Sequence, residues 1–421
     1  MNLVGLAWKN LWRRKRRTSI TATSIGFGVF IAVTFSGMGD YSYTNMINTS
    51  AKMGLGHISI QAPGYMQSPS LDKQIHHVND IQQRLATLNG VEDSYVRIQG
   101  QAMFASAHKS VGGAFLAIDV NSERAEHNLF IRSLVEGEIF IKRWRGANET
   151  LSGIVIGQGM AKKLKLRLGK KLVYTTTDKH GDIVNGMARV SGIFATGVKD
   201  IDNSVTLLPI QTLRETIGYS ADEASVVAVM IKDQRYTDKL LKLVQLRVSE
   251  LGRNETEVLS WRETQSEVAG MIRLDRSSNQ VSQILIGVLI AAGVLNTLLM
   301  SVLERTREFG VMMALGMAPL SLFALVVVES VWLALMGLSV GVLVTVPWYL
   351  YMNRVGIDLS GSIGDDYSAG GVLIDPVLRI YLYPETILMI LFTVLMLTLL
   401  SGLYPAWRAG RNPPIDSLKA M

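Results

Sequence analysis

Four apolar segments, each about as long as a membrane-crossing helix, constrain the fold of this chain more than any other feature. They are residues 18–38, 281–303, 320–347 and 386–405, and a helix needs about 20 apolar residues to cross a bilayer. Residues 39–280, between the first two segments, have the composition of an ordinary water-soluble domain. The sequence therefore predicts an α-helical, four-span membrane protein with one large domain outside the bilayer.

Lysine and arginine are unevenly distributed among the segments that flank the spans. Residues 1–17, 304–319 and 406–421 together hold eleven of them: Lys9, Arg13, Arg14, Lys15, Arg16, Arg17, Arg305, Arg307, Arg408, Arg411 and Lys419. The loop 351–383 has two, Arg354 and Arg379, against four acids: Asp358, Asp365, Asp366 and Asp375. Because basic residues favour the cytoplasmic side, both termini and the 304–319 segment are predicted to be cytoplasmic. The domain at 39–280 and the short loop at 348–385 then face outward.

The first 17 residues are predicted to form a cytoplasmic interfacial helix, because Trp8 and Trp12 lie among the basic residues. A merely solvated basic tail is the alternative. A cleaved signal peptide fits less well, because the following apolar run is long, lacks a clear A-x-A site and precedes three more spans.

Residues 39–280 are predicted to be mixed α/β. "HISIQA" and "SVVAVMI" have the pattern of strands, while residues 78–90 and 236–252 repeat apolar residues at helical spacing. The centre, about residues 108–205, is rich in strands and turns, which predicts an inserted second lobe. Helical extensions of the first two spans, at residues 39–53 and 262–280, are expected to connect this domain to the membrane.

No motif in the chain predicts catalysis or cofactor binding. "LGKKL" lacks the Ser or Thr that would complete a Walker A sequence, and the six histidines have no recognisable metal-ligand spacing. "GLSVG", residues 337–341, matches a hydrolase pattern but lies inside the third span, where G-x-x-x-G allows close helix packing. We therefore predict a non-catalytic chain with no cofactor or metal of its own. Its net charge of +7 is attributed to membrane orientation, not to nucleic acid.

The third span contains one acid, Glu329, about nine residues from its start and so roughly 14 Å deep. An acid within a membrane is costly and usually faces a partner or a cavity. One interpretation is a proton relay, and the other is a hydrogen bond from Glu329 to Asn296 of the second span or to a neighbouring hydroxyl. Because no second acid or base is found within the spans, the Glu329–Asn296 polar pair is favoured.

The segment 304–319 is predicted to contain a short amphipathic helix between the second and third spans. Its helix-forming residues end at Gly316, with Pro319 beyond. Phe309, Met312 and Leu315 give it an apolar side, so that a force on this helix would move two spans together. A simple connector is the alternative.

Four stretches resemble the FtsX/MacB-type (type VII) ABC transporter permeases, and the resemblance covers nearly the whole chain. They are "LERTREFGVMMALGM", "YPAWRAGRNPPIDSLKAM", "IVIGQGMAKKLKLRLGKKL" and "VSGIFATGVKDIDNSVTLLPI". The resemblance implies an outer domain with a porter-like lobe and an inserted sabre-like lobe. It also implies that 304–319 is a coupling helix that docks on a separate ATPase, present in two copies, which binds ATP and Mg. The implied coupling residues are Glu304, Arg305, Arg307, Glu308, Phe309, Met312 and Leu315.

Within that family the layout is most similar to the lipoprotein-releasing LolC/LolE permeases. This implies a bacterial inner-membrane protein that pairs with a second, identical or paralogous permease and works by mechanotransmission. It would extract lipoproteins or similar amphiphiles toward the periplasm and a periplasmic carrier or adaptor. A MacB-like efflux permease with a separate ATPase and a non-transporting FtsX-like regulator are the alternatives. Residues of the first span expected to contact acyl chains are Ile25, Phe27, Phe30, Ile31 and Phe35.

Overall fold

The computed structural model describes residues 3–140, 144–145, 150–250, 256–363, 368–369, 372–373 and 375–411. Of the charged residues used above for orientation, Asp365, Asp366 and Lys419 lie outside the described residues. The chain divides into two compact units. The helical unit comprises residues 1–42, 273–358 and 377–421, and the α/β unit comprises residues 43–272 and 359–376.

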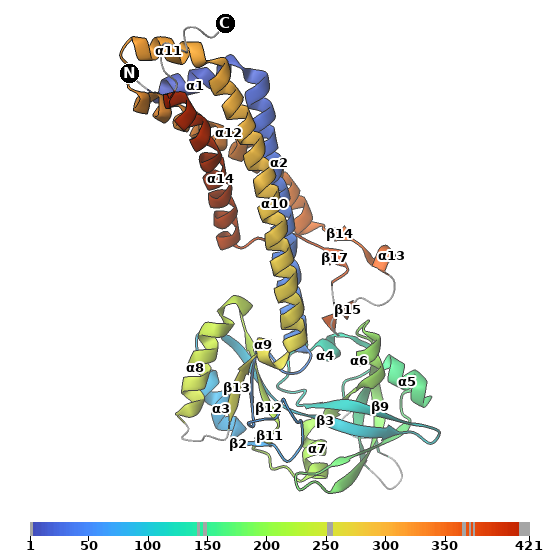
Figure 1. Ribbon diagram of the computed structural model, residues 1–421. Coiled ribbons are helices and arrows are strands. Elements are labelled where there is room, and N and C mark those ends of the chain that lie inside the picture. Colours follow the sequence, from blue (N-terminus) through green and yellow to red (C-terminus); the bar gives the residue numbers. More distant parts are fainter. Residues whose placement is uncertain are drawn as a thin grey trace. The chain divides into compact units, whose positions relative to one another are not determined.

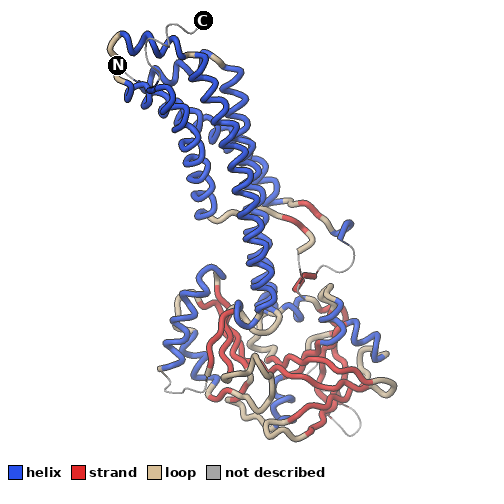
Figure 2. Tube along the Cα trace, in the orientation of Figure 1, coloured by secondary structure: helices blue, strands red, loops and turns tan. Residues whose placement is uncertain are grey.

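In the described ranges, six helices contribute to the helical unit, which Figures 1 and 2 show to be built almost entirely of helices. They are α1 (Leu3–Arg13), α2 (Lys15–Lys52), α10 (Ser266–Glu304), α11 (Thr306–Ala314), α12 (Pro319–Arg354) and α14 (Pro384–Arg411). Among the described residues, α2, α10, α12 and α14 are long and apolar enough to cross a membrane. Each covers one predicted span. The 36 residues of α12 extend roughly 54 Å at about 1.5 Å per residue, so this helix is longer than a bilayer core is thick.

Two glycines of α12 allow this helix to pack very closely against α2. A Cβ placed on Gly337 would lie 2.5 Å from Ile25, and one on Gly341 would lie 2.8 Å from Val29. Any larger side chain at these two positions would push the helices apart. The interpretation of "GLSVG" as a helix-packing motif is therefore confirmed.

Helices α1, α10, α11, α12 and α14 meet in an apolar cluster at one end of the helical unit (Figure 1). Its buried members are Ala7, Val302, Phe309, Leu322, Leu325, Val326, Ala406 and Ala409. The rings of Trp8 and Trp332 lie 4.8 Å apart between α1 and α12. The interfacial helix predicted near the N-terminus is thus a packed part of the helical unit.

The α/β unit begins with a four-stranded antiparallel sheet in the order β13-β1-β12-β3. Helices α3 and α8 pack beside it, as Figure 1 shows. We call this part the first lobe. Its strands and helices are β1 (Ile58–Gln61), α3 (Val78–Leu85), β3 (Val91–Ala105), β12 (Val226–Ile231), α8 (Thr237–Ser249) and β13 (Glu257–Ser260).

The second half of β3 belongs to a closed ring of six strands, β3-β4-β10-β7-β9-β8, which we call the barrel lobe. Arg97 is the last residue of β3 paired with β12, and Ile98 is the first paired with β4. The barrel lobe therefore starts before the predicted residue 108, because one strand serves both lobes. It contains β4 (Ser110–Ile118), α4 (Leu129–Arg132), β5 (Leu134–Gly137), β7 (Thr150–Gly157), α5 (Gln158–Leu164), β8 (Lys171–Thr177), β9 (Ile183–Phe194), α6 (Lys199–Ser204), β10 (Val205–Pro209) and α7 (Ile210–Ile217).

The two faces of the long strand β3 have different neighbours, because successive side chains in a strand point to opposite sides. On one face, Ile98, Phe115 and Val227 belong to a single apolar core that runs through both lobes. On the other face, Tyr95 lies in a small separate cluster with Ala51 of α2. The end of α2 thus packs against the face that lacks a continuous core.

Candidate functional site

The buried carboxylate of Glu329, on α12, is held by side chains from two other segments. Asn10 Nδ2 donates to Glu329 Oε1 at 2.7 Å, and Arg305 Nη1 donates to the same oxygen at 2.9 Å. Arg305 is itself buried, and its Nε donates to Glu308 Oε2 at 3.0 Å. One carboxylate therefore connects α1, α12 and the corner between α10 and α11.

The predicted polar pair of Glu329 with Asn296 is wrong. Asn296 is exposed, whereas Thr297, the next residue, faces α2 and pairs its hydroxyl with that of Thr21 at 2.9 Å. Successive residues of a helix point in directions about 100° apart. Because Thr297 of α10 faces α2, the side chain of Asn296 points away from this contact and is exposed. The partner of Glu329 is instead Arg305, from the segment between the spans.

The depth of Glu329 in a bilayer stays a prediction, but the structure shows what surrounds this residue. The first turns of α12, including Leu322 and Val326, pack in the cluster with Ala7 of α1 and Phe309 of α11. Glu329 consequently lies level with Arg305 at the end of α10. Within the part of the chain that the structure describes, it is therefore a paired carboxylate and not a lone acid.

Further ion pairs surround this site. Glu304 pairs with Arg14 and Arg17, and Glu308 pairs with Arg13 at 3.3 Å. These side chains are partly exposed, and exposed ion pairs each contribute only about 0–1 kcal/mol. The arginines, with Asn10, Arg305 and Glu329, line a cavity of about 240 Å³. Glu304 and Glu308 thus bind to the helical unit itself.

The residues predicted to couple to an ATPase lie on two different sides of α11. Phe309 is 1% exposed, and its ring centroid lies 5.0 Å from the guanidinium carbon of Arg305. Leu315 is 83% exposed, and Arg307 is also exposed. The expectation that Phe309 belongs to a docking surface is wrong, because the turn of α11 places it in the core. Met312 is half-buried against the same core.

The residues predicted to contact acyl chains also differ in exposure. Ile25 is fully buried against Gly337, so its assignment is wrong. Phe27 and Phe35 are 60% and 58% exposed, while Phe30 and Ile31 are half-buried.

An aromatic strip continues from Phe27 onto α12, which the sequence did not reveal. Centroid distances are 6.2 Å from Phe27 to Phe30, 5.9 Å from Phe30 to Trp348 and 6.3 Å from Trp348 to Tyr351. Trp348 and Tyr351 lie one helical turn apart, and this spacing can be read from the sequence. The contact of Trp348 with Phe30 of α2 cannot be read from the sequence.

Among the described residues, no group of three or more His, Asp or Glu side chains is arranged to hold a metal ion. His57 is 4% exposed, and its Nε2 lies 3.0 Å from Asn48 Oδ1. Burial, with the nearby Lys52 charge, lowers the pKa of His57 to about 4. This histidine is therefore a neutral structural residue at neutral pH.

Two family descriptions match the chain. The MacB-like periplasmic core domain matches residues 18–245, which is more than half of the 421 residues, and the FtsX-like permease C-terminal region matches residues 281–414. The chain belongs to the FtsX/MacB-type (type VII) ABC transporter permeases. Membrane-spanning helices with such a periplasmic domain are typical of inner-membrane ABC permeases. The chain is a transporter permease subunit and not a catalytic enzyme.

Three relatives show the range of the family that the chain resembles. An uncharacterized ABC transporter permease of Methanocaldococcus jannaschii is 24% identical, with 99% of this chain and 98% of the relative covered. The lipoprotein-releasing system transmembrane protein LolE of Haemophilus influenzae is 20% identical, with the same coverage of both chains. The pyoverdine export ATP-binding/permease protein PvdT of Pseudomonas aeruginosa is 25% identical, over 99% of this chain and 58% of the relative.

Proposed function

We propose that this chain works by mechanotransmission. A separate ATPase moves α11, the attached long helices move with it, and the α/β unit changes shape. The observation that carries this proposal is the attachment of α11 to its neighbours. Arg305, just before α11, binds Glu329 of α12, which also binds Asn10 of α1. A short helix fixed in this way transmits a push, whereas a flexible connector would absorb it.

The docking surface for the ATPase is the exposed side of α11. Leu315 is 83% and Val311 is 44% exposed, and Arg307 lies beside them. An apolar side chain so exposed near a basic one suits a protein partner. The full assembly contains two ATPase copies, which bind ATP and Mg, and a second permease, identical or paralogous. The termini and α11 are then cytoplasmic and the α/β unit periplasmic, as the distribution of basic residues indicates.

The cargo proposed for this permease is a lipoprotein or a similar amphiphile, taken from the inner membrane toward a periplasmic carrier. The similarity to LolE over nearly the whole of both chains supports this proposal. So does the exposure of Phe27 and Phe35 on α2, which gives the first span aromatic surface for acyl chains. Helix α10 also exposes Ile284, Leu285 and Leu289, which lipid or the second permease would cover.

Efflux of a small molecule is the second candidate function. The similarity to PvdT, whose name describes pyoverdine export, favours it at a comparable level of identity. In this case the permease would work with a separate ATPase and a periplasmic adaptor. A regulator without cargo, acting on a periplasmic protein, would use the same helices.

Affinity purification of the tagged chain in mild detergent, with mass spectrometry of all bound proteins and lipid-modified chains, tests these functions. A separate ATPase, a second permease and acylated lipoproteins are expected. An ATPase with a periplasmic adaptor and no acylated protein would favour efflux. An ATPase with a periplasmic enzyme and no cargo would favour regulation, and recovery of no ATPase would contradict every form of the proposal.

The variant Leu315→Asp tests the docking surface in the same experiment. It should reduce ATPase recovery about tenfold or more, because a charge replaces an exposed apolar contact. Leu320→Asp is the matched control, since Leu320 is 76% exposed at the start of α12, beyond both α11 and its C-terminal cap residue Leu315. Equal recovery with both variants would contradict the assignment of α11.

A further inference from the structure

Arg97 is a fully buried arginine at the junction of the two lobes of the α/β unit. It pairs with Val226 of β12, and the next residue of β3, Ile98, pairs with Ala117 of β4. A buried charge is costly unless it is paired and hydrogen-bonded. The hydrogen-bond partners that make burial of this guanidinium possible are therefore supplied by the fold around it.

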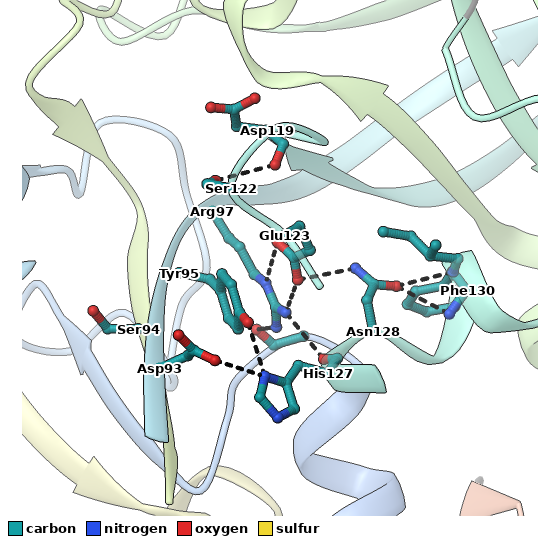
Figure 3. Close-up of polar contacts among 12 residues, drawn as sticks. Asp93, Ser94, Tyr95, Arg97, Asp119, Ser122, Glu123, His127, Asn128 and Phe130 are labelled. Atoms are coloured by element: carbon teal, nitrogen blue, oxygen red, sulfur yellow. Dashed lines mark hydrogen bonds and ion pairs between the residues drawn. The ribbon is translucent and has the colours of Figure 1, made fainter. Parts of the chain in front are cut away.

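Figure 3 shows how the guanidinium of Arg97 is surrounded. Its Nη2 and Nε donate to the carboxylate of Glu123, with Nε 3.4 Å from Oε2. Nη1 donates to the carbonyl oxygen of Gly54, just beyond the end of α2, at 2.6 Å. Nη2 also lies 3.4 Å from the His127 carbonyl, and the ring of Tyr95 covers the guanidinium at 5.3 Å. One side chain thus joins the end of α2 to the loop that follows β4.

The contacts continue from Glu123 into the barrel lobe (Figure 3). Asn128 Nδ2 donates to Glu123 Oε1 at 3.1 Å, and Asn128 Oδ1 accepts from the backbone N–H of Phe130 at 3.0 Å. The latter bond caps the N-terminus of α4. Phe130 is buried, with its ring 5.2 Å from that of Phe194 on β9. A chain of hydrogen bonds therefore runs from the end of α2 to the barrel core.

Apolar packing on this face of the sheet is interrupted where Arg97 lies. One small cluster consists of Ala51, Tyr95 and Met230, and a second one contains Phe130 and Phe194. Half-buried Met53, at the end of α2, touches the second cluster. The ion pair of Arg97 with Glu123 bridges the two clusters, whereas the opposite face has one continuous core.

The first lobe is joined to the long helices by the chain itself. Strand β1 follows α2 after a short turn, and β13 leads through α9 (Trp261–Thr264) into α10. A capping box of Ser260 and Glu263 fixes the start of α9, and Trp261 N–H donates to the His57 carbonyl at 2.9 Å. Among the described residues, no strand of the barrel lobe directly follows α2 in the chain, and the Arg97 network ties this lobe to Gly54, just beyond the end of α2.

We propose that Arg97 and Glu123 are positioning residues of the transport cycle, which anchor the end of α2 to the barrel lobe so that this lobe follows α2. This inference rests on the proposed mechanotransmission. An apolar pair of similar volume would often serve stability as well as a buried ion pair. The contribution of the ion pair is its directed bonds to Gly54 and, through Glu123, to Asn128.

Distances between pairs of spin labels, measured by pulsed electron–electron double resonance in the full complex with its ATPase, test the anchor. The chain contains no cysteine, so cysteines for spin labels can replace exposed residues at chosen places. Leu274 on α10 is 73% exposed, Ile183 on the barrel lobe 76% and Leu246 on the first lobe 58%. The pair 274–183 reports on the barrel lobe, and the pair 274–246 reports on the first lobe.

In the unmodified background, both distances should shift between the nucleotide-free and ATP-trapped states. In Arg97→Met, the 274–183 distribution should broaden about twofold and lose most of its shift, while the 274–246 shift remains. Arg97→Lys, which keeps a charged donor, should restore part of the shift. Arg189→Met is the matched control, because Arg189 Nη1 donates to the Gly169 carbonyl at 2.7 Å inside the barrel lobe. It should leave both distances unchanged.

The double variant Arg97→Met/Glu123→Leu keeps the test decisive if Arg97→Met alone fails to fold, because it leaves no unpaired charge. An unchanged 274–183 shift in the double variant would overturn the anchor. If neither distance shifts with nucleotide in the unmodified background, mechanotransmission itself fails. The anchor is then still judged by the width of the nucleotide-free 274–183 distribution, and an unchanged width in the double variant would refute it.

Discussion

Two buried arginines, Arg305 in the helical unit and Arg97 in the α/β unit, have similar surroundings. Each binds one buried acid, Glu329 or Glu123, and each is covered by an aromatic ring at 5.0 Å or 5.3 Å. Their remaining acceptors differ. Arg305 bonds a second carboxylate, that of Glu308, whereas Arg97 bonds two backbone carbonyls.

The difference follows from the elements around each arginine. Arg305 is surrounded by helices, whose interior carbonyls already accept bonds from residues four positions on. The acceptors of its guanidinium are therefore side chains. Arg97 lies beside the turn after α2 and the loop after β4, where carbonyls such as that of Gly54 have no such partner. A buried arginine that is surrounded by helices thus takes its hydrogen-bond acceptors from acidic side chains. One that lies beside loops can also bond to backbone carbonyls.

Removal of the acid from each pair should give the largest effects and tests this comparison directly. Glu123→Leu should cost about 3–5 kcal/mol of unfolding free energy, because it leaves the fully buried Arg97 without a carboxylate partner. Glu329→Leu should cost about 1–2 kcal/mol less, since Arg305 keeps the carboxylate of Glu308. Denaturant unfolding of the purified chain in detergent measures both. Equal losses would show that the second carboxylate, that of Glu308, contributes nothing to the stability of Arg305.

The aromatic cover of Arg305 is the next largest contribution. Phe309→Ala should destabilise the helical unit by about 3–4 kcal/mol, because a fully buried ring is lost. Leu315→Ala, on the exposed side of the same helix, should change stability by less than about 0.5 kcal/mol. Thermal unfolding of both variants checks the assignment of the two sides of α11. Similar costs would mean that Phe309 is not part of the core.

Acid should weaken the α/β unit through His57. Its pKa is lowered to about 4 in the folded chain from an ordinary 6.5, so between these values the unfolded chain binds the extra proton. Stability from this residue is therefore full above pH 6.5 and is lost as the pH falls, by about 2 kcal/mol at pH 5.

The variant His57→Gln removes this titration and should flatten the loss between pH 6.5 and 5. Proteolysis of the α/β unit across this range measures its local stability. An unchanged pH slope in the variant would assign the acid sensitivity to other groups.

Glu329→Gln should have a smaller effect than Glu329→Leu, because the amide oxygen still accepts from Arg305 and Asn10. A loss of about 1–2 kcal/mol is expected from the missing charge, with the complex still assembled and active. Cargo release by the reconstituted complex is the measurement. Severe and equal loss of transport in assembled Glu329→Gln and Glu329→Leu would instead support a proton relay.

Much of the architecture could be predicted because it depends on local pattern. The four spans follow from apolar length, and α3, α8, β1, β12 and the short helix α11 follow from the spacing of apolar residues. The inserted lobe was recognised but placed too late in the chain, because β3 looks like one strand and serves two lobes. Strand sharing leaves no mark in local composition.

The site residues were predicted less well, and Arg97 shows why. In "SYVRIQGQ" the polar residues Tyr95, Arg97 and Gln99 alternate with apolar ones, a pattern that predicts a solvent-facing side. That side is covered by the end of α2 and the loop carrying Glu123. Alternation therefore shows that the two sides of β3 differ, but not which segments cover them.

The sequence by itself determined which segments are long and apolar enough to cross a membrane, which segment forms the short helix between them and which family the chain resembles. These properties depend on residues that are close together in the chain. The tertiary structure alone decided which acid meets which base, since Asn10 and Glu329 are 319 positions apart, and which face of a helix is covered. Burial is set by packing between distant segments, and the free energy of a charge depends on that burial.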